Sequence, residues 1–269
     1  AGIAHIRHTW LPENRYQRNQ PADGAELADD LEKIVQNFGA DSIAACFVEP
    51  IAGSTGCLVP PVGYLERLRE ICDQHGILLV FDEVICGFGR TGEPFASQTF
   101  GVTPDIMTLA KALTNAAQPM GAIVVGQHVY DSIVNAAPDR VIELFHGYTY
   151  SGHPAACAAG LATLDIYRDE NLFERGRSLS AYFQDSIFAL KEFDIVTDIR
   201  GYGMIAGIDL APSGGPGNVG ITVQKKLFHA GLHVKATGDA LIVAPPLVST
   251  EANIDEISDK LKKVFQSSS

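Results

Sequence analysis

Apolar and polar residues alternate with two different periods along the chain, which predicts a succession of strands and helices. The clearest run is 77–81, Ile-Leu-Leu-Val-Phe, whose length and composition are typical of a strand buried on both faces. Before it, residues 64–75 carry apolar side chains at helical spacing and are followed by a glycine. A strand at 42–49 comes earlier still. This order of strand, helix and strand predicts a βαβ unit and a parallel sheet.

The same patterns predict the remaining elements of the chain. Further helices are expected at 25–38, 129–135 and 155–167, and further strands at 106–110 and 122–125. From residue 195 the pattern changes to an α+β module. Its expected elements are strands at 194–201, 204–210, 232–238 and 240–246 and helices at 219–231 and 251–265.

Two polar residues follow neighbouring strands of the predicted parallel sheet. Asp82 comes directly after the run 77–81, and Lys111 comes directly after the run 106–110. Ligands of open parallel sheets bind beyond the carboxyl ends of the strands, so both side chains are expected at one crevice. A lysine that forms a Schiff base, beside a carboxylate that keeps a ring nitrogen protonated, is the arrangement used by pyridoxal phosphate. The spacing alone leaves a second interpretation open, in which Asp82 caps a turn and Lys111 is a solvated lysine.

Longer motifs around these residues carry a family resemblance. The segments FDEVICGFGRTG, GVTPDIMTLAKALTN and PMGAIVVG resemble the class III (ω-amino acid) aminotransferases. The segments ELFHGYTYSGHPAACAAGLATLDIYRDENLFER and DIRGYGMIAGIDL are similar to the β-alanine (ω-amino acid):pyruvate transaminases. The resemblance runs along almost the whole chain.

The resemblance implies a fold and a division into domains. The fold is the type I pyridoxal-phosphate transferase fold, an α/β fold with a mostly parallel central sheet, helices on both faces and a C-terminal α+β small domain. Residues 1–153 are expected to form the second half of the large cofactor-binding domain, and 154–269 the bridging helix and the small domain. Family members are longer, so the upstream part that grips the cofactor phosphate is expected to be missing.

The resemblance also assigns roles to single residues. It makes Lys111 the Schiff-base lysine, Asp82 the partner of the pyridinium nitrogen, and Val84 the side chain packed on one face of the ring. Thr149, in the segment HGYTYSG, is expected to bind the cofactor phosphate of a second subunit. The active site would then require a homodimer, or a dimer of dimers.

Other positions concern the substrate and the framework of the site. Glu49 corresponds to a glutamate on the substrate side in relatives, and Arg90 is expected to fix its loop by pairing with a carboxylate. Ile85 stands where some relatives have a glutamine that contacts the cofactor. Lys235 stands where the β-alanine:pyruvate branch has a carboxylate-binding arginine. Because lysine offers a point charge in place of a planar fork, Lys235 is either a looser clamp or an exposed lysine.

Composition narrows the class of protein. With 20 basic and 32 acidic residues the net charge is −12, which argues against nucleic acid as the main partner. No apolar run is long enough to cross a bilayer. The 5 cysteines have no metal-ligand spacing and are interpreted as reduced thiols of a cytoplasmic protein.

The expected function is pyridoxal-phosphate-dependent transamination from an ω-amino acid, such as β-alanine, or from an amine to pyruvate. Two alternatives remain open from the sequence. One is an aminomutase or racemase on the same fold. The other is a catalytically inactive chain that serves only as a dimerisation module.

Overall fold

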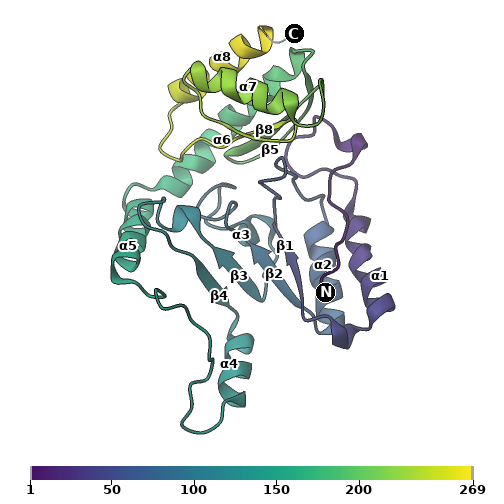
Figure 1. Cartoon of the computed structure of the whole chain (residues 1–269), viewed down its shortest axis with the longest axis vertical. Helices are drawn as coiled ribbons and strands as arrows, with labels where there is room; N and C mark the ends of the chain where they lie inside the picture. The colour runs from purple at the N-terminus through teal and green to yellow at the C-terminus, as the bar shows by residue number, and fades with distance from the viewer. Residues whose placement is uncertain (1, 268–269) are drawn as a thin grey trace.

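Two four-stranded sheets organise the chain, which the computed structural model describes over residues 2–267. The first sheet lies in the middle of Figure 1 and has the order β1-β2-β3-β4. The second lies above it and has the order β5-β6-β8-β7. The architecture is the α/β fold expected from the sequence.

The first sheet is parallel except at one edge. Its strands are β1 (Ala45–Val48), β2 (Leu78–Asp82), β3 (Ile106–Leu109) and β4 (Ala122–Val125). The pairs β1–β2 and β2–β3 are parallel, whereas β4 runs antiparallel to β3. The predicted mostly parallel sheet is therefore confirmed.

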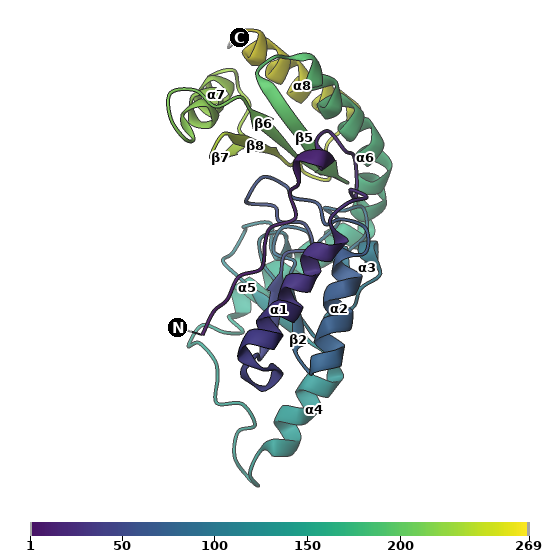
Figure 2. The ribbon, with the colours of Figure 1, turned by 90° about the vertical axis from the view of Figure 1, so that its right-hand side faces the viewer.

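The helix between β1 and β2 shows why the sequence pattern was informative. Helix α2 (Tyr64–His75) buries Leu65, Leu68 and Cys72 completely, and these residues recur at helical spacing. The helix ends at Gly76, whose φ of 67° is the left-handed conformation that glycine adopts most readily. Helix α1 (Asp29–Phe38) lies alongside α2 in both views (Figures 1 and 2).

The second sheet is antiparallel and packs against three helices. Its strands are β5 (Val196–Tyr202), β6 (Ile205–Leu210), β7 (Lys235–Thr237) and β8 (Ala240–Val243). Most helical residues of its core come from α6 (Leu172–Phe188), α7 (Asn218–His229) and α8 (Glu251–Gln266). Figure 2 shows α6 and α8 on one side of this sheet and α7 on the other.

Helix α6 was not predicted. No element was expected between residues 168 and 194, although Leu172, Leu179, Phe183 and Ile187 do recur at helical spacing and are all buried. Gly176 and several serines interrupt the pattern and lower the helix propensity. The helix forms because tertiary burial outweighs that weak propensity.

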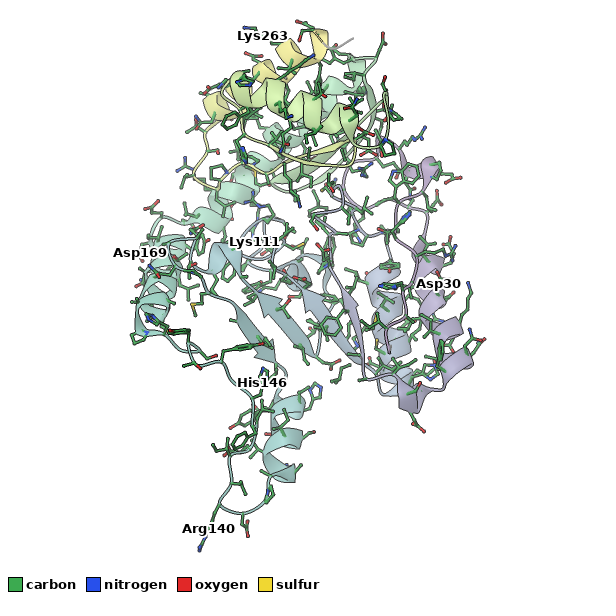
Figure 3. All side chains as sticks on the ribbon, in the orientation of Figure 1. Asp30, Lys111, Arg140, His146, Asp169 and Lys263 are labelled. Atoms are coloured by element: carbon green, nitrogen blue, oxygen red, sulfur yellow. The ribbon has the colours of Figure 1, made fainter. Side chains whose placement is uncertain are left out.

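The helices around the first sheet complete the fold. They are α3 (Ala96–Phe100), α4 (Gln127–Ala136) and α5 (Pro154–Asp169). The described residues also form 3-10 turns, at Pro12–Asn14, Ala25–Ala28, Ala40–Ser42, Lys111–Leu113 and Ala189–Glu192. The segment 137–153 follows α4, and we call it the arm. The arm and α4 project from the rest of the chain, with Arg140 at the tip (Figures 1 and 3).

The arm exposes large apolar side chains. Phe145 is 88% exposed, Tyr150 81% and Tyr148 76%. Such a cluster of exposed aromatic residues is uncommon on a monomer and is typical of an interface.

The five cysteines are all free. No described helix combines the length and the apolarity that a bilayer crossing requires.

Leu68→Ala is expected to destabilise the chain by about 2–5 kcal/mol, because it leaves a cavity in the core between α2 and the first sheet. The control is Glu66→Ala on the exposed face of the same helix, which should change stability by no more than about 0.5 kcal/mol. Urea unfolding of both variants measures the difference. Equal losses would place Leu68 outside the core.

Candidate active site

The parallel register of the first sheet brings three predicted residues to one edge. Val48 pairs with Phe81, so Glu49 and Asp82 follow paired residues of β1 and β2. Asp82 in turn pairs with Thr108 of β3, three residues before Lys111. In Figure 3, Lys111 lies between the first sheet and the upper part of the chain. The carboxyl ends of the three parallel strands therefore face the second sheet.

Asp82 is half-buried and only partly engaged by the protein. Its Oδ1 accepts a hydrogen bond from the backbone N–H of Val84 (3.0 Å). Within residues 2–267 no donor is bound to its second oxygen. This N–H bond fixes the orientation of the carboxylate and leaves one oxygen available to a ligand.

Lys111 begins the 3-10 turn Lys111–Leu113 with a φ of 48°. Left-handed backbone is unfavourable for a residue with a Cβ, and such residues concentrate at functional sites. The Lys111 side chain is exposed in this chain, not buried as is usual for a reactive lysine. Among the described residues its ammonium forms no ion pair, so no carboxylate of this chain competes with a ligand for it.

Glu49 is electrostatically connected to the other three predicted charges. Its Oε2 accepts a hydrogen bond from the Gly53 N–H (3.1 Å). Burial raises the pKa of the Glu49 carboxyl, and the charge of Asp82 adds to this effect. The Gly53 N–H and the charges of Lys111 and Lys235 act in the opposite direction on the same pKa. Glu49 is therefore electrostatically coupled to these three residues, and we call the four charges the Glu49 cluster.

Lys235 reaches this cluster from the second sheet. It is the first residue of β7, an edge strand, and it pairs with Ile242 of β8. Its side chain is exposed, yet its charge acts on Glu49. Both interpretations of Lys235 made from the sequence therefore stay open as predictions.

Two predicted cofactor residues have different positions. Val84 follows Asp82 and is half-buried, so it lies at the same strand end. Thr149 lies in the exposed arm and takes no part in the cluster of Glu49, Asp82, Lys111 and Lys235. Its predicted role requires a second chain.

Two further residues near the site form contacts that the sequence did not predict. Glu83, which received no role, is completely buried and accepts hydrogen bonds from the N–H groups of Ala96 (2.7 Å) and Ser97 (2.7 Å). It thereby fixes the start of α3 against the end of β2. No sequence signal marks this bond, because its partners are backbone groups of a later segment.

Arg90 does fix its loop, but the predicted partner was wrong. Its guanidinium donates to the carbonyl oxygens of Met204 (2.9 Å) and Pro245 (2.6 Å), and not to a carboxylate. These bonds connect the loop after β2 to the second sheet. The correction follows from geometry, since backbone carbonyls lie within reach of a side chain that is mostly enclosed.

The Glu49 cluster can be tested by titration in the chain without any ligand. We expect the Glu49 carboxyl to titrate above pH 4.5, the ordinary value for glutamate. Lys111→Ala should raise its pKa further, because a stabilising positive charge is lost. Asp82→Asn should lower it, because a repelling negative charge is lost.

Carbon-detected NMR of the side-chain carboxyl measures these three values. The exposed Glu66→Gln variant serves as the control and should leave the titration of Glu49 unchanged. A pKa that does not move in opposite directions for Lys111→Ala and Asp82→Asn would show that Lys111 and Asp82 do not act on Glu49 as proposed.

Comparisons with known proteins show what the chain is similar to. The chain is 51% identical over 266 residues to an omega-aminotransferase of Caulobacter vibrioides, covering 98% of this chain and 60% of that protein. It is 44% identical over 260 residues to a beta-alanine–pyruvate aminotransferase of Pseudomonas aeruginosa, covering 96% of this chain and 58% of that protein. The chain thus spans about 60% of the length of these curated relatives.

A solved structure shows the same fold. A transaminase with L-Ala superimposes with a TM-score of 0.88 at 34% identity, over 98% of this chain and 65% of that one. The sequence pattern of the aminotransferase class-III family matches residues 3–265. The chain belongs to the class-III aminotransferases.

Proposed function

We propose that this chain supplies the lysine and the ring-nitrogen carboxylate of a pyridoxal-phosphate-dependent aminotransferase. The amino group would pass from an ω-amino acid or amine to pyruvate. The observation that carries the proposal is the position of Asp82 and Lys111 at neighbouring strand ends, each with a polar atom that no described residue occupies. Membership of the class-III family, whose members use pyridoxal phosphate, supports the same conclusion.

The residues present fit this cofactor. A bound pyridoxal phosphate supplies an electron-accepting ring, which stabilises the charge left when a substrate carbon loses its proton. The unoccupied oxygen of Asp82 would hold a proton on the ring nitrogen. The Lys111 amine would attach the cofactor aldehyde and, when displaced, carry the proton between the substrate Cα and the cofactor carbon. Val84 would pack on one face of the ring.

The substrate end of the site is proposed to involve Lys235 and Glu49. A substrate whose carboxylate lies far from its amine could place the carboxylate near the Lys235 ammonium. Glu49, whose pKa is raised by burial, is acted on by the charges of both Lys235 and Lys111. The beta-alanine–pyruvate relative of Pseudomonas aeruginosa supports β-alanine as the donor to test first.

The proposed assembly is a homodimer, or a dimer of such dimers, in the cytoplasm. The exposed aromatic residues of the arm support an interface there, and Thr149 lies among them. In a dimer Thr149 would reach the cofactor phosphate of the partner subunit. Five free cysteines support a reducing compartment.

Lys111→Ala is expected to abolish transamination and covalent attachment of the cofactor while leaving the fold intact, because Lys111 is exposed and not part of the core. Borohydride reduction with pyridoxal phosphate, followed by mass spectrometry, should locate the attachment on the peptide that contains Lys111. The assay is run on this chain and on a polypeptide of the relatives' full length.

Lys263→Ala is the matched control, since this exposed lysine lies at the far end of the molecule (Figure 3). It should retain both attachment and turnover. Attachment at another lysine, or ordinary turnover by Lys111→Ala, would remove Lys111 from the mechanism.

Lys235 is tested by comparing charged and uncharged donors. If its ammonium binds the substrate carboxylate, Lys235→Ala should raise KM for β-alanine and pyruvate by about tenfold, the effect of roughly one charged hydrogen bond. The half-reaction with an uncharged arylalkyl amine should be nearly unchanged. Lys235→Arg should lower KM for the carboxylate substrates, because the planar fork adds a second hydrogen bond. Equal effects on both kinds of donor, or none on either, would rule out Lys235 as the carboxylate clamp.

A further inference from the structure

A tight hairpin turn, formed by residues 52–58, lies between Glu49 and the second sheet. Ala52 and Leu58 close it with two reciprocal backbone hydrogen bonds of 3.0 Å. Inside it, the N–H groups of Gly56 (3.3 Å) and Cys57 (3.2 Å) both donate to the carbonyl of Gly53. These internal bonds hold the residues of the hairpin turn together as one local unit.

One end of the hairpin turn is bonded to Glu49 of the candidate site. The Gly53 N–H donates to Glu49 Oε2 (3.1 Å) and so fixes where the carboxylate points. The Ile85 side chain packs against the same glycine so closely that a Cβ on Gly53 would lie 2.7 Å from Ile85 Cγ2. Position 53 therefore sets the spacing between the loop after β1 and the loop after β2.

The other end of the hairpin turn is held by the second sheet. The carbonyl of Gly56 accepts hydrogen bonds from Arg200 Nη2 (2.9 Å) and Nε (3.3 Å). On β6, a Cβ on Gly207 would lie 2.1 Å from the same carbonyl oxygen, so only glycine permits this approach. The turn therefore sits directly against β5 and β6.

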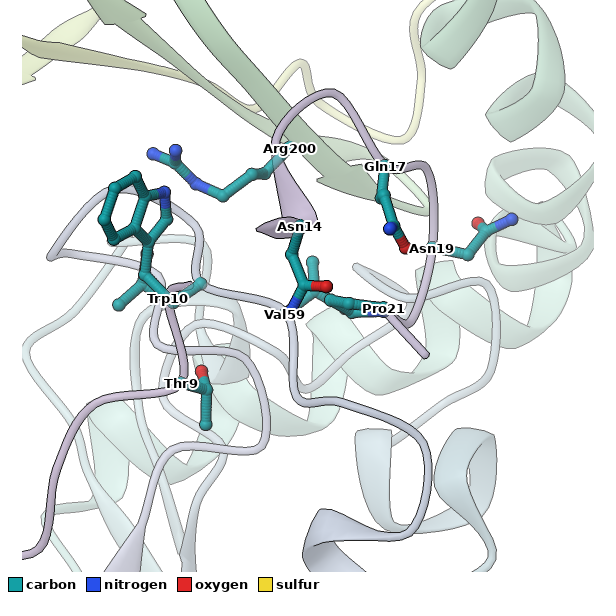
Figure 4. A pocket seen from close by; sticks show the side chains of 9 residues that line it. Thr9, Trp10, Asn14, Gln17, Asn19, Pro21, Val59 and Arg200 are labelled. Atoms are coloured by element: carbon teal, nitrogen blue, oxygen red, sulfur yellow. The ribbon is translucent and has the colours of Figure 1, made fainter. Parts of the chain in front are cut away.

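Arg200 is itself rigidly placed. Both oxygens of Asp209 accept from its guanidinium (2.6 and 2.7 Å), and Asp198 forms a further ion pair with it. Asp198 also accepts hydrogen bonds from the Tyr16 N–H (2.7 Å) and from Trp10 Nε1 (3.0 Å). Trp10 and Arg200 line the same small cavity of about 10 Å³ (Figure 4). Such buried charges persist only when each is paired and hydrogen-bonded.

We propose that Arg200 is a positioning residue that sets the distance between Glu49 and Lys235 by holding the hairpin turn against the second sheet. The inference deepens the proposed function, on which its link to substrate rests. Arg200 lies on β5 and Lys235 on β7 of one sheet, while Glu49 is connected to that sheet through Gly53 and Gly56. A looser turn would change the fit of a substrate that spans both ends of the site.

The positioning role is tested without cofactor or substrate, by amide hydrogen exchange. Arg200→Lys keeps the charge but loses the planar guanidinium, which bonds to the carboxylates of Asp198 and Asp209 and to the Gly56 carbonyl at the same time. The Gly53 amide should then exchange about tenfold faster, which corresponds to the loss of roughly one hydrogen bond. The Leu79 amide, which donates to Asp105 at the opposite end of the first sheet, should show only the change in global stability.

Arg69→Lys is the matched control. Arg69 is also mostly enclosed and pairs with two carboxylates, those of Asp73 and Asp105. This variant should accelerate exchange at Leu79 and spare Gly53. If Arg200→Lys does not fold, Asp209→Asn replaces it, because the partly exposed Asp209 supports Arg200 and, among the described residues, forms no hydrogen bond with the turn. Gly53 exchange that is no faster than in Arg69→Lys would overturn the positioning role.

The link to substrate is measured in the holoenzyme. Arg200→Lys or Asp209→Asn should raise KM for β-alanine about tenfold, the same free-energy change as in the exchange experiment, and leave kcat for an uncharged amine unchanged. Equal losses for both donors would overturn the link and show a merely structural role. Absence of transamination in the unmodified enzyme would contradict the proposed function, and the exchange result would still decide the positioning role.

Discussion

The parallel register of β1, β2 and β3 is the constraint on which the site depends. Because the three strands run in one direction, their carboxyl ends lie on the same edge, and each delivers one charged residue there. A one-residue slip would turn Asp82 to the opposite face of the sheet. Leu79 and Phe81 pack in the core beneath α2, and Val80 is buried on the other face, so such a slip would disrupt the packing on both faces. The packing that buries β2 therefore also fixes the position of Asp82.

The elements with strong local signals could be predicted from the sequence. Helix α2 has its apolar stripe and its terminal Gly76, and β2 is a short apolar run, so each was predicted within one residue of its bounds. Helix α6 was missed because Gly176 and its serines weaken the pattern, and only burial against the second sheet decides its conformation. The family membership, predicted from long motifs, is confirmed by the match over residues 3–265.

The contacts between distant segments could not be predicted. Glu83 and Arg90 were visible as charged residues, but their partners are backbone groups of other segments. Arg200 bonds to Gly56, 144 positions away, and a sequence pattern carries no signal for such a pair. Periodicity reports which face of an element is buried, whereas these bonds depend on how whole sheets meet. The roles of Val84 and Thr149 stay predictions for a related reason, since each needs a partner that lies outside this chain.

The backbone contributes to the site as much as the side chains do. Val84 orients Asp82 through its N–H, and Gly53 does the same for Glu49. Backbone donors lose little entropy on forming these bonds, because the turns that carry them are already fixed. The carboxylates are therefore held in place, and no residue within 2–267 donates a hydrogen bond to their remaining oxygens. Such preorganisation explains how a site with an exposed Lys111 can still hold its charges in a defined arrangement.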